Sequence, residues 1–233
     1  MKHGTGIIKE VFLDGSAQID CTTDLIPAPG QYLLAHAPAS DSPIADSVFF
    51  SRSTANGFIA AAPLPVFWMP GISLSLRGPL GHKFVIPLTA HKVALVAFDD
   101  SPARLHGLIS LALEQKSEVV VLCDSKTSGL PEVVEIQPLQ AMLEILEWAD
   151  YAAIDVAREN LNQLLEKLGG WDQPKARCEA QVLIRAQMPC GALAECGACA
   201  VTIHHQWRMV CKDGPVFELN ELLFKSSREC GSF

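Results

Sequence analysis

Residues 188–217 read MPCGALAECGACAVTIHHQWRMVCKDGPVF, and this stretch decides what kind of protein the sequence encodes. It holds four of the eight cysteines of the chain, in the spacing C-x5-C-x2-C-x11-C: Cys190, Cys196, Cys199 and Cys211. Thiolates are soft, anionic ligands that suit iron–sulfur clusters and zinc. Glycines beside them let backbone N–H groups approach sulfur. The spacing therefore predicts a [2Fe–2S] cluster held by these four cysteines.

Two other roles of these cysteines, in core packing and in zinc binding, compete with a cluster. Cysteine can serve as a small apolar core residue, but packing cysteines do not gather in one glycine- and alanine-rich loop. Zinc ribbons usually pair two C-x2-C knuckles, and only Cys196 and Cys199 form such a knuckle here. Plant-type [2Fe–2S] proteins use C-x4-C-x2-C and a distant cysteine, so this chain has one extra residue on the side of Cys190. A zinc-stabilised site stays open as the alternative.

The composition limits the class of protein. With 233 residues, of which 49% are hydrophobic, the chain can bury a large core in one or more domains. Its net charge of −8 argues against nucleic acid as a partner. The uncharged stretch 53–76 contains Pro63, Pro65 and Pro70, which break helices, so no membrane span is expected.

The remaining cysteines lack a ligand-like spacing. No signal peptide is visible at the start of the sequence, so a cytoplasmic location is expected, where thiols stay reduced and available to metal. We interpret Cys21, Cys123 and Cys178 as packing residues and Cys230 as a tail thiol.

The hydrophobic pattern predicts a β domain followed by an α/β domain. Short strands separated by turn residues are expected at 6–13, 17–20, 32–34, 48–50, 57–60 and 74–76, which indicates an antiparallel β-barrel over 1–88. Apolar strands at 93–98, 119–123, 132–136 and 151–156 alternate with helices at 104–115, 139–146 and 157–168. This alternation indicates a parallel sheet over 89–177. A strand at 179–185 leads into a cluster-binding domain over 178–233, which a segment at 217–223 closes.

Several motifs together resemble one family. They are Pro29-Gly30-Gln31-Tyr32, Pro70-Gly71, Arg77-Gly78-Pro79-Leu80-Gly81, Cys190-Gly191, Cys196, Cys199 and the string CKDGPVF over 211–217. With them the chain resembles the electron-transfer subunit of dihydroorotate dehydrogenase, within the ferredoxin-reductase-like superfamily. The resemblance implies FAD, a [2Fe–2S] cluster, NADH as electron source and an FMN-bearing catalytic partner in a hetero-oligomer of pyrimidine biosynthesis.

The nucleotide motifs of that family are degenerate here. Asp46-Ser47-Val48-Phe49 stands where the family has an Arg-Pro-x-Ser-like segment for flavin, and Arg52-Ser53-Thr54 lies just downstream. The loop 98–104 has no glycine and carries Asp99 and Asp100 where phosphates would lie. We interpret it as a helix start, with Asp100 or Ser101 capping and Pro102 at the first position.

The segment Asp155-Val156-Ala157-Arg158 replaces the family's Cys-Gly-Pro segment. No residue can be assigned to FAD or NAD; FAD is doubtful and NAD is disfavoured.

The other candidates have ordinary structural explanations. Glu195 could lower the reduction potential of a cluster, but an exposed loop carboxylate is the simpler interpretation. His204, His205 and Trp207 are expected in a hairpin, and Trp148 and Trp171 in the core or an interface.

The sequence thus predicts an electron-transfer subunit without catalytic residues of its own, so whether it is an enzyme stays open. The alternatives are a zinc-stabilised assembly subunit and an NADH-dependent flavin reductase with atypical loops.

Overall fold

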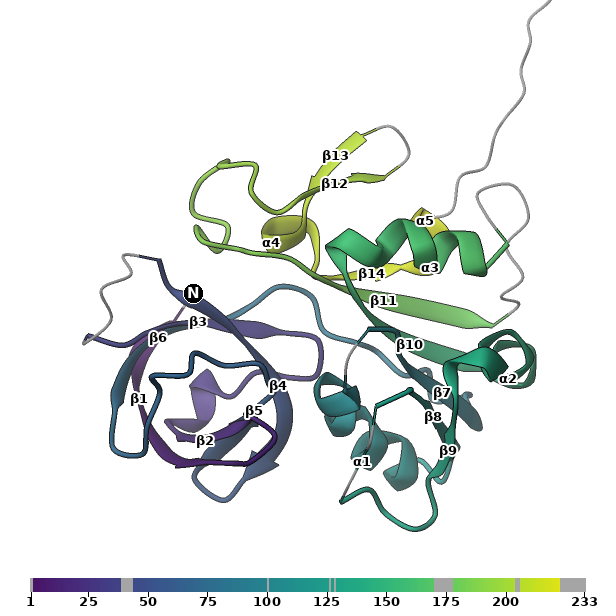
Figure 1. Ribbon diagram of the computed structural model, residues 1–233, viewed down its shortest axis with the longest axis horizontal. Helices are drawn as coiled ribbons and strands as arrows, with labels where there is room; N and C mark the ends of the chain where they lie inside the picture. The colour runs from purple at the N-terminus through teal and green to yellow at the C-terminus, as the bar shows by residue number, and fades with distance from the viewer. Residues whose placement is uncertain are drawn as a thin grey trace, which may run out of the picture.

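The computed structural model describes residues 2–38, 44–99, 101–125, 127, 129–169, 178–203 and 206–222. The chain forms a closed barrel, a six-stranded sheet with helices, and a cysteine-bearing segment that ends in a two-stranded hairpin (Figure 1). In the described part of the chain, no helix is both long and apolar enough to cross a membrane.

The barrel consists of six antiparallel strands in the order β1-β2-β5-β4-β3-β6. They are β1 (Lys2–Val11), β2 (Ala17–Asp20), β3 (Tyr32–His36), β4 (Asp46–Thr54), β5 (Gly57–Ala60) and β6 (Ser73–Leu80). Closure leaves no unpaired sheet edge. The predicted barrel is confirmed, but the strand predicted at 48–50 was too short. There β4 has nine residues, because pairing with β3 and β5 extends the ladder through polar residues such as Arg52.

The sheet has the order β14-β11-β10-β7-β8-β9. Its parallel strands are β7 (Lys92–Ala97), β8 (Glu118–Leu122), β9 (Glu135–Gln137), β10 (Tyr151–Ala157) and β11 (Glu179–Arg185), and β14 (Val216–Glu218) joins antiparallel to β11. The helices are α1 (His106–Glu114), α2 (Met142–Trp148) and α3 (Leu161–Lys167).

The ends of three predicted elements were wrong. Residues Pro102–Arg104 and Arg158–Asn160 are 3-10 turns, so α1 and α3 begin later than expected. The strand predicted at 132–136 begins three residues later, at Glu135, because the amide of Val134 closes a turn on the carbonyl of Pro131.

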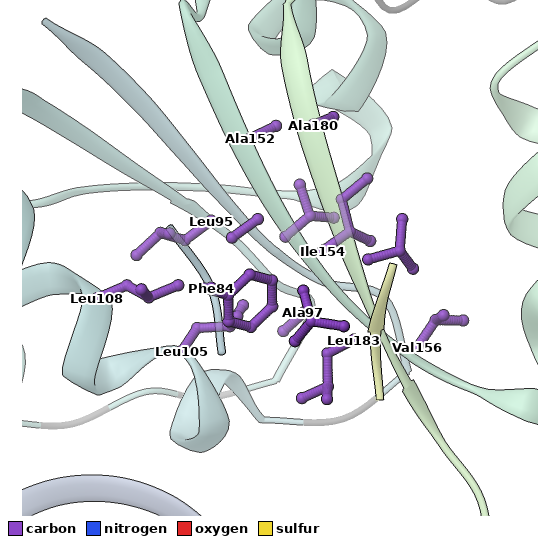
Figure 2. Packing of buried hydrophobic residues seen from close by; sticks show 14 of the residues in the cluster. Phe84, Leu95, Ala97, Leu105, Leu108, Ala152, Ile154, Val156, Ala180 and Leu183 are labelled. Carbon is purple, nitrogen blue, oxygen red and sulfur yellow. The ribbon is translucent and has the colours of Figure 1, made fainter. Parts of the chain in front are cut away.

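One hydrophobic cluster spans the junction of the barrel and the sheet, while the interior of the barrel forms a second cluster. The larger cluster of buried residues includes Tyr32, Leu34 and Phe49 of the barrel together with the sheet strands and with Cys199 and Cys211. Figure 2 shows part of this core, where Phe84, from the segment between barrel and sheet, lies among side chains of β7, β10, β11 and α1. Because apolar burial is the main favourable term in folding, this shared core fixes the cysteine segment against both neighbours.

The cysteine segment leaves the sheet at β11 and returns to it at β14. Between them lie β12 (Ala200–Ile203), β13 (Gln206–Met209) and the short helix α4 (Val210–Asp213), and α5 (Leu219–Leu222) follows β14. We propose that the domain boundaries lie at residues 89 and 178. Two strands of the last domain, β11 and β14, belong to the central sheet.

Candidate metal centre at the cysteine loop

The four predicted ligands lie close together. Cys190 and Cys196 lie in the loop after β11, with their sulfur atoms 3.6 Å apart. The β12–β13 hairpin turns the chain back, so that the amide of Val210 donates to the carbonyl of Cys199 at 3.2 Å. The amide of Cys211 then points at the Cys199 sulfur, at 3.4 Å. The hairpin therefore places two ligands that are distant in sequence beside each other.

The sulfur atoms form two linked pairs. Cys190 pairs with Cys196, and Cys199 with Cys211, while the thiols of Cys190 and Cys211 also interact. In the ranges that the structure describes, no three His, Cys, Asp or Glu side chains converge as ligands of one ion. A single zinc ion needs all four sulfurs around one point, whereas a two-iron cluster takes them in pairs. Four thiols brought together in this way suit a metal centre of either kind.

The thiols differ in how easily they ionise. Burial raises the pKa of Cys190, but hydrogen bonds with the Ala194 backbone and the Cys196 thiol outweigh it and lower the pKa to about 7. Burial, with the neighbouring Cys199, raises the pKa of Cys211 to about 12. Metal binding must displace the proton from such a buried thiol.

The cysteines outside the loop behave as packing residues. Burial raises the pKa of Cys21 to about 11 and also raises the pKa of Cys123 and Cys178. All three pack against the hydrophobic clusters, as predicted. Cys230 lies outside the described residues.

Side chains of the barrel hold the cysteine loop in place. Arg77 of β6 donates from Nη2 to the carbonyls of Cys190 and Gly191, at 2.7 and 3.1 Å. Gly191 has φ +49°, and a Cβ added there would lie 2.2 Å from that nitrogen. Tyr32 of β3 donates its hydroxyl to the carbonyl of Cys211 at 3.2 Å. Two barrel side chains thus fix both ends of the ligand set.

Three of the motifs that carry the family resemblance meet at this same interface. The amide of His82 donates to the carbonyl of Gly214 at 2.7 Å, and Gln31 donates to the carbonyl of Gly81 at 3.0 Å. Gly81 has φ +78°, and a Cβ there would lie 2.2 Å from the ring of Pro215. These motifs are distant in sequence but form one contact between the barrel and the segment after Cys211.

Charged side chains fill the carboxyl ends of β7, β10 and β11. Asp155 is 1% exposed and pairs with Arg104 at 3.2 Å and with Arg185 at 2.7 Å. Arg185 also pairs with Asp99 at 2.9 Å, and Asp99 accepts from the amide of Ala157 as well. Pyrophosphate groups bind at this edge in dinucleotide-binding folds. Here the edge is occupied by carboxylates that are already paired with arginines.

The loop before α1 therefore differs in part from its prediction. Pro102 does occupy the first position of a turn, but Ser101 makes no capping hydrogen bond with its side chain. Asp100 lies outside the described residues. Asp99 joins the ends of β7, β10 and β11 and takes no part in a helix cap.

A cavity of about 530 Å³ lies between the barrel and this edge of the sheet. Its lining includes Asp46, Glu159, Arg104 and Arg185. Both arginines are paired within the network, and two carboxylates face the same space. The two carboxylates repel a phosphate group and the two arginines attract one, so the lining assigns no residue to flavin. Arg52 is exposed and is not among the lining residues of the cavity.

The remaining predicted candidates have structural surroundings. Glu195 is exposed and lies 3.8 Å from Lys212. Trp207 is exposed on β13, and the hairpin that it was predicted to join is present. Trp148 packs against the core, with the Lys92 ammonium over its ring. His204, His205 and Trp171 lie outside the described residues.

Sequence reasoning placed Tyr32 and Arg77 in motifs of the family resemblance without giving them a role, and it missed Arg104 and Arg185. For the two missed arginines, the signal was Asp155, a lone carboxylate in an apolar strand that needs a buried partner. The partners come from distant segments and could not be identified from spacing.

Comparisons with known proteins agree with this geometry. Residues 186–223 match the model of the iron–sulfur cluster binding domain of dihydroorotate dehydrogenase B. A curated relative is the electron transfer subunit of dihydroorotate dehydrogenase B (NAD(+)) from Desulforamulus reducens, 27% identical over 175 residues. The match covers 64% of this chain and 64% of that protein, so the chain spans slightly less than two thirds of its relative.

Solved structures share the fold. The NADH-dependent reduced ferredoxin–NADP oxidoreductase superimposes with a TM-score of 0.72 and 15% identity, covering 93% of this chain and 89% of the other. The ferredoxin reductase of carbazole 1,9a-dioxygenase gives a TM-score of 0.58 and 13% identity, over 71% of this chain and 64% of the other. The chain has a ferredoxin-reductase-like fold and resembles the electron-transfer subunit of dihydroorotate dehydrogenase B, with degenerate FAD and NAD motifs.

Proposed function

We propose that this chain is an electron-transfer subunit whose resident cofactor is a [2Fe–2S] cluster held by Cys190, Cys196, Cys199 and Cys211. The observation that carries the proposal is the pairing of the four sulfurs in a segment that matches the iron–sulfur domain model. When bound, such a cluster takes up and releases one electron at a time.

The residues of the chain supply binding and orientation. The four thiolates hold the irons, and the amide of Cys211 directs a hydrogen bond at the Cys199 sulfur. Arg77 and Tyr32 fix the loop on the barrel. Cys196 is exposed, whereas Cys199 and Cys211 are buried. Electrons would therefore leave and enter on the side of Cys196, where a partner can approach.

By its resemblance, the partner would be the FMN-bearing catalytic subunit of a dihydroorotate dehydrogenase, in a hetero-oligomer. No residue is assigned to FAD or NAD, because the sheet edge is occupied by the Arg104–Asp155–Arg185–Asp99 network. The cluster would then exchange electrons between the catalytic subunit and another carrier.

A pair of serine variants tests the ligand assignment. Anaerobically purified protein should show visible charge-transfer absorption, which Cys199→Ser should abolish or strongly change. Cys123→Ser is the matched control, because that thiol is buried in the sheet away from the loop. A Cys199→Ser variant that keeps the full spectrum would refute the assignment, as would colourless wild-type protein containing zinc.

A further inference from the structure

We infer that Arg77 is a positioning residue that raises the reduction potential of the cluster, in addition to holding its loop. The inference rests on the proposed function, because it concerns how this chain acts on that cluster. Arg77 lies on β6, opposite His3 of β1 and Leu34 of β3, and reaches the cysteine loop across 113 residues of sequence.

The contact between Arg77 and the loop is close. One guanidinium nitrogen, Nη2, donates to both the Cys190 and Gly191 carbonyls. Only glycine fits above it, because a Cβ on residue 191 would also lie 2.5 Å from Leu34 Cδ1. The guanidinium of Arg77 is therefore held against the backbone of Cys190, a predicted ligand.

Within the described ranges, no carboxylate forms an ion pair with Arg77. Its other terminal nitrogen, Nη1, is buried and has no hydrogen-bond partner among the described residues. A half-buried cation is costly without a counter-charge, whereas four thiolates around a cluster would supply negative charge beside it.

This charge lies beside the ligand set. Arg77 Nη2 lies 2.7 Å from the carbonyl of Cys190, and the sulfur of Cys190 lies 3.6 Å from that of Cys196. Arg77 and Cys190 also line one hollow of the surface. Reduction adds an electron to the cluster, so a fixed positive charge there stabilises the reduced form and raises the potential.

Arg158 offers a matched control, because it contacts the backbone of the same cysteine loop at another point. It also donates to a loop carbonyl, that of Ala198, at 2.5 Å. Unlike Arg77, it is 37% exposed and lies 3.8 Å from Glu159, so its charge is screened and partly balanced.

The test is a redox titration followed by EPR on wild type, Arg77→Gln, Arg77→Lys and Arg158→Gln, with iron and sulfide measured for each. Arg77→Gln should shift the midpoint to a more negative potential, Arg77→Lys should shift it much less, and Arg158→Gln should stay near wild type. A purely structural role would lower cluster content without this charge-dependent order.

The outcomes separate this inference from the proposed function. Wild-type protein without a cluster would overturn both. A wild-type potential in a cluster-loaded Arg77→Gln would overturn the inference alone. If Arg77→Gln assembles no cluster, Arg77→Lys decides: a cluster at near wild-type potential supports the inference. A strongly lowered potential, or no cluster, in Arg77→Lys overturns it.

Discussion

Replacing Arg104 with methionine should destabilise the fold as a whole, because Arg104 joins the barrel to the sheet. Its side chain is 4% exposed, pairs with Asp155 at 3.2 Å and donates to the carbonyl of Ala62. The guanidinium also lies 6.0 Å from the ring centroid of Phe49. Methionine keeps much of the apolar volume but removes all three polar interactions.

The expected loss of stability depends on whether Asp155 keeps a partner after Arg104 is replaced. Removing one partner of a buried ion pair costs about 3–5 kcal/mol when the other charge is orphaned. Asp155 keeps Arg185 at 2.7 Å, so its charge is not orphaned and the cost falls toward the lower end. The lost bond to Ala62 adds to it, because hydrogen bonds from charged groups contribute about 1.5–3 kcal/mol. Together these two contributions predict a loss of about 4–5 kcal/mol.

Urea denaturation followed by tryptophan fluorescence measures this loss, since Trp68 lies in the barrel core and Trp148 beside the sheet. Arg158→Met is the control, and should lose no more than about 1 kcal/mol because its ion pair with Glu159 is exposed. Equal losses below about 1 kcal/mol in both variants would refute the reasoning that the network ties the two parts together.

Three further predictions follow from the geometry. Gly191→Ala should reduce the iron content of the protein sharply, because the added Cβ would clash with Arg77 and Leu34. Gly197→Ala is the control: Gly197 has φ +76° and no atom within 4 Å of an added Cβ, so this variant should cost only about 1 kcal/mol of backbone strain and keep the cluster. Equal iron content in both variants would contradict this prediction. NADH should neither bind tightly nor bleach the cluster in purified protein, because Asp99 and Asp155 occupy the phosphate edge; bleaching without an added flavoprotein would show a nucleotide site. A fragment of residues 178–233 should not fold alone, because β11 and β14 lie in the sheet beside β10; a cooperative thermal transition of the fragment would contradict this.

Much of the architecture was predictable because it depends on local pattern. The apolar runs at 93–98 and 119–123 correspond to β7 and β8, since strands covered on both faces are continuously hydrophobic. The turns and short strands of the first 88 residues indicated a closed barrel. The extent of β4 was not predictable, because its polar half is held by pairing partners on both sides.

The candidate site was predictable only in its ligands. Cysteine spacing points directly to metal chemistry, whereas the residues around the ligands are chosen by the fold. Arg77 and Tyr32 reach the cysteine loop from strands that are more than 100 residues away in sequence. Asp99 was predicted to lie near a helix start, but it is tied to Arg185 and to the amide of Ala157. Tyr32 and Arg77 stand in motifs of the family resemblance, but which distant residues they contact cannot be identified from the sequence.

The measurement that tests the central claim most directly is metal and sulfide analysis of anaerobically purified protein, together with its EPR spectrum after reduction. A [2Fe–2S] centre predicts about two irons and two inorganic sulfides per chain, and a paramagnetic signal that appears only on reduction. Colourless protein with about one zinc per chain, no sulfide and no signal would contradict it.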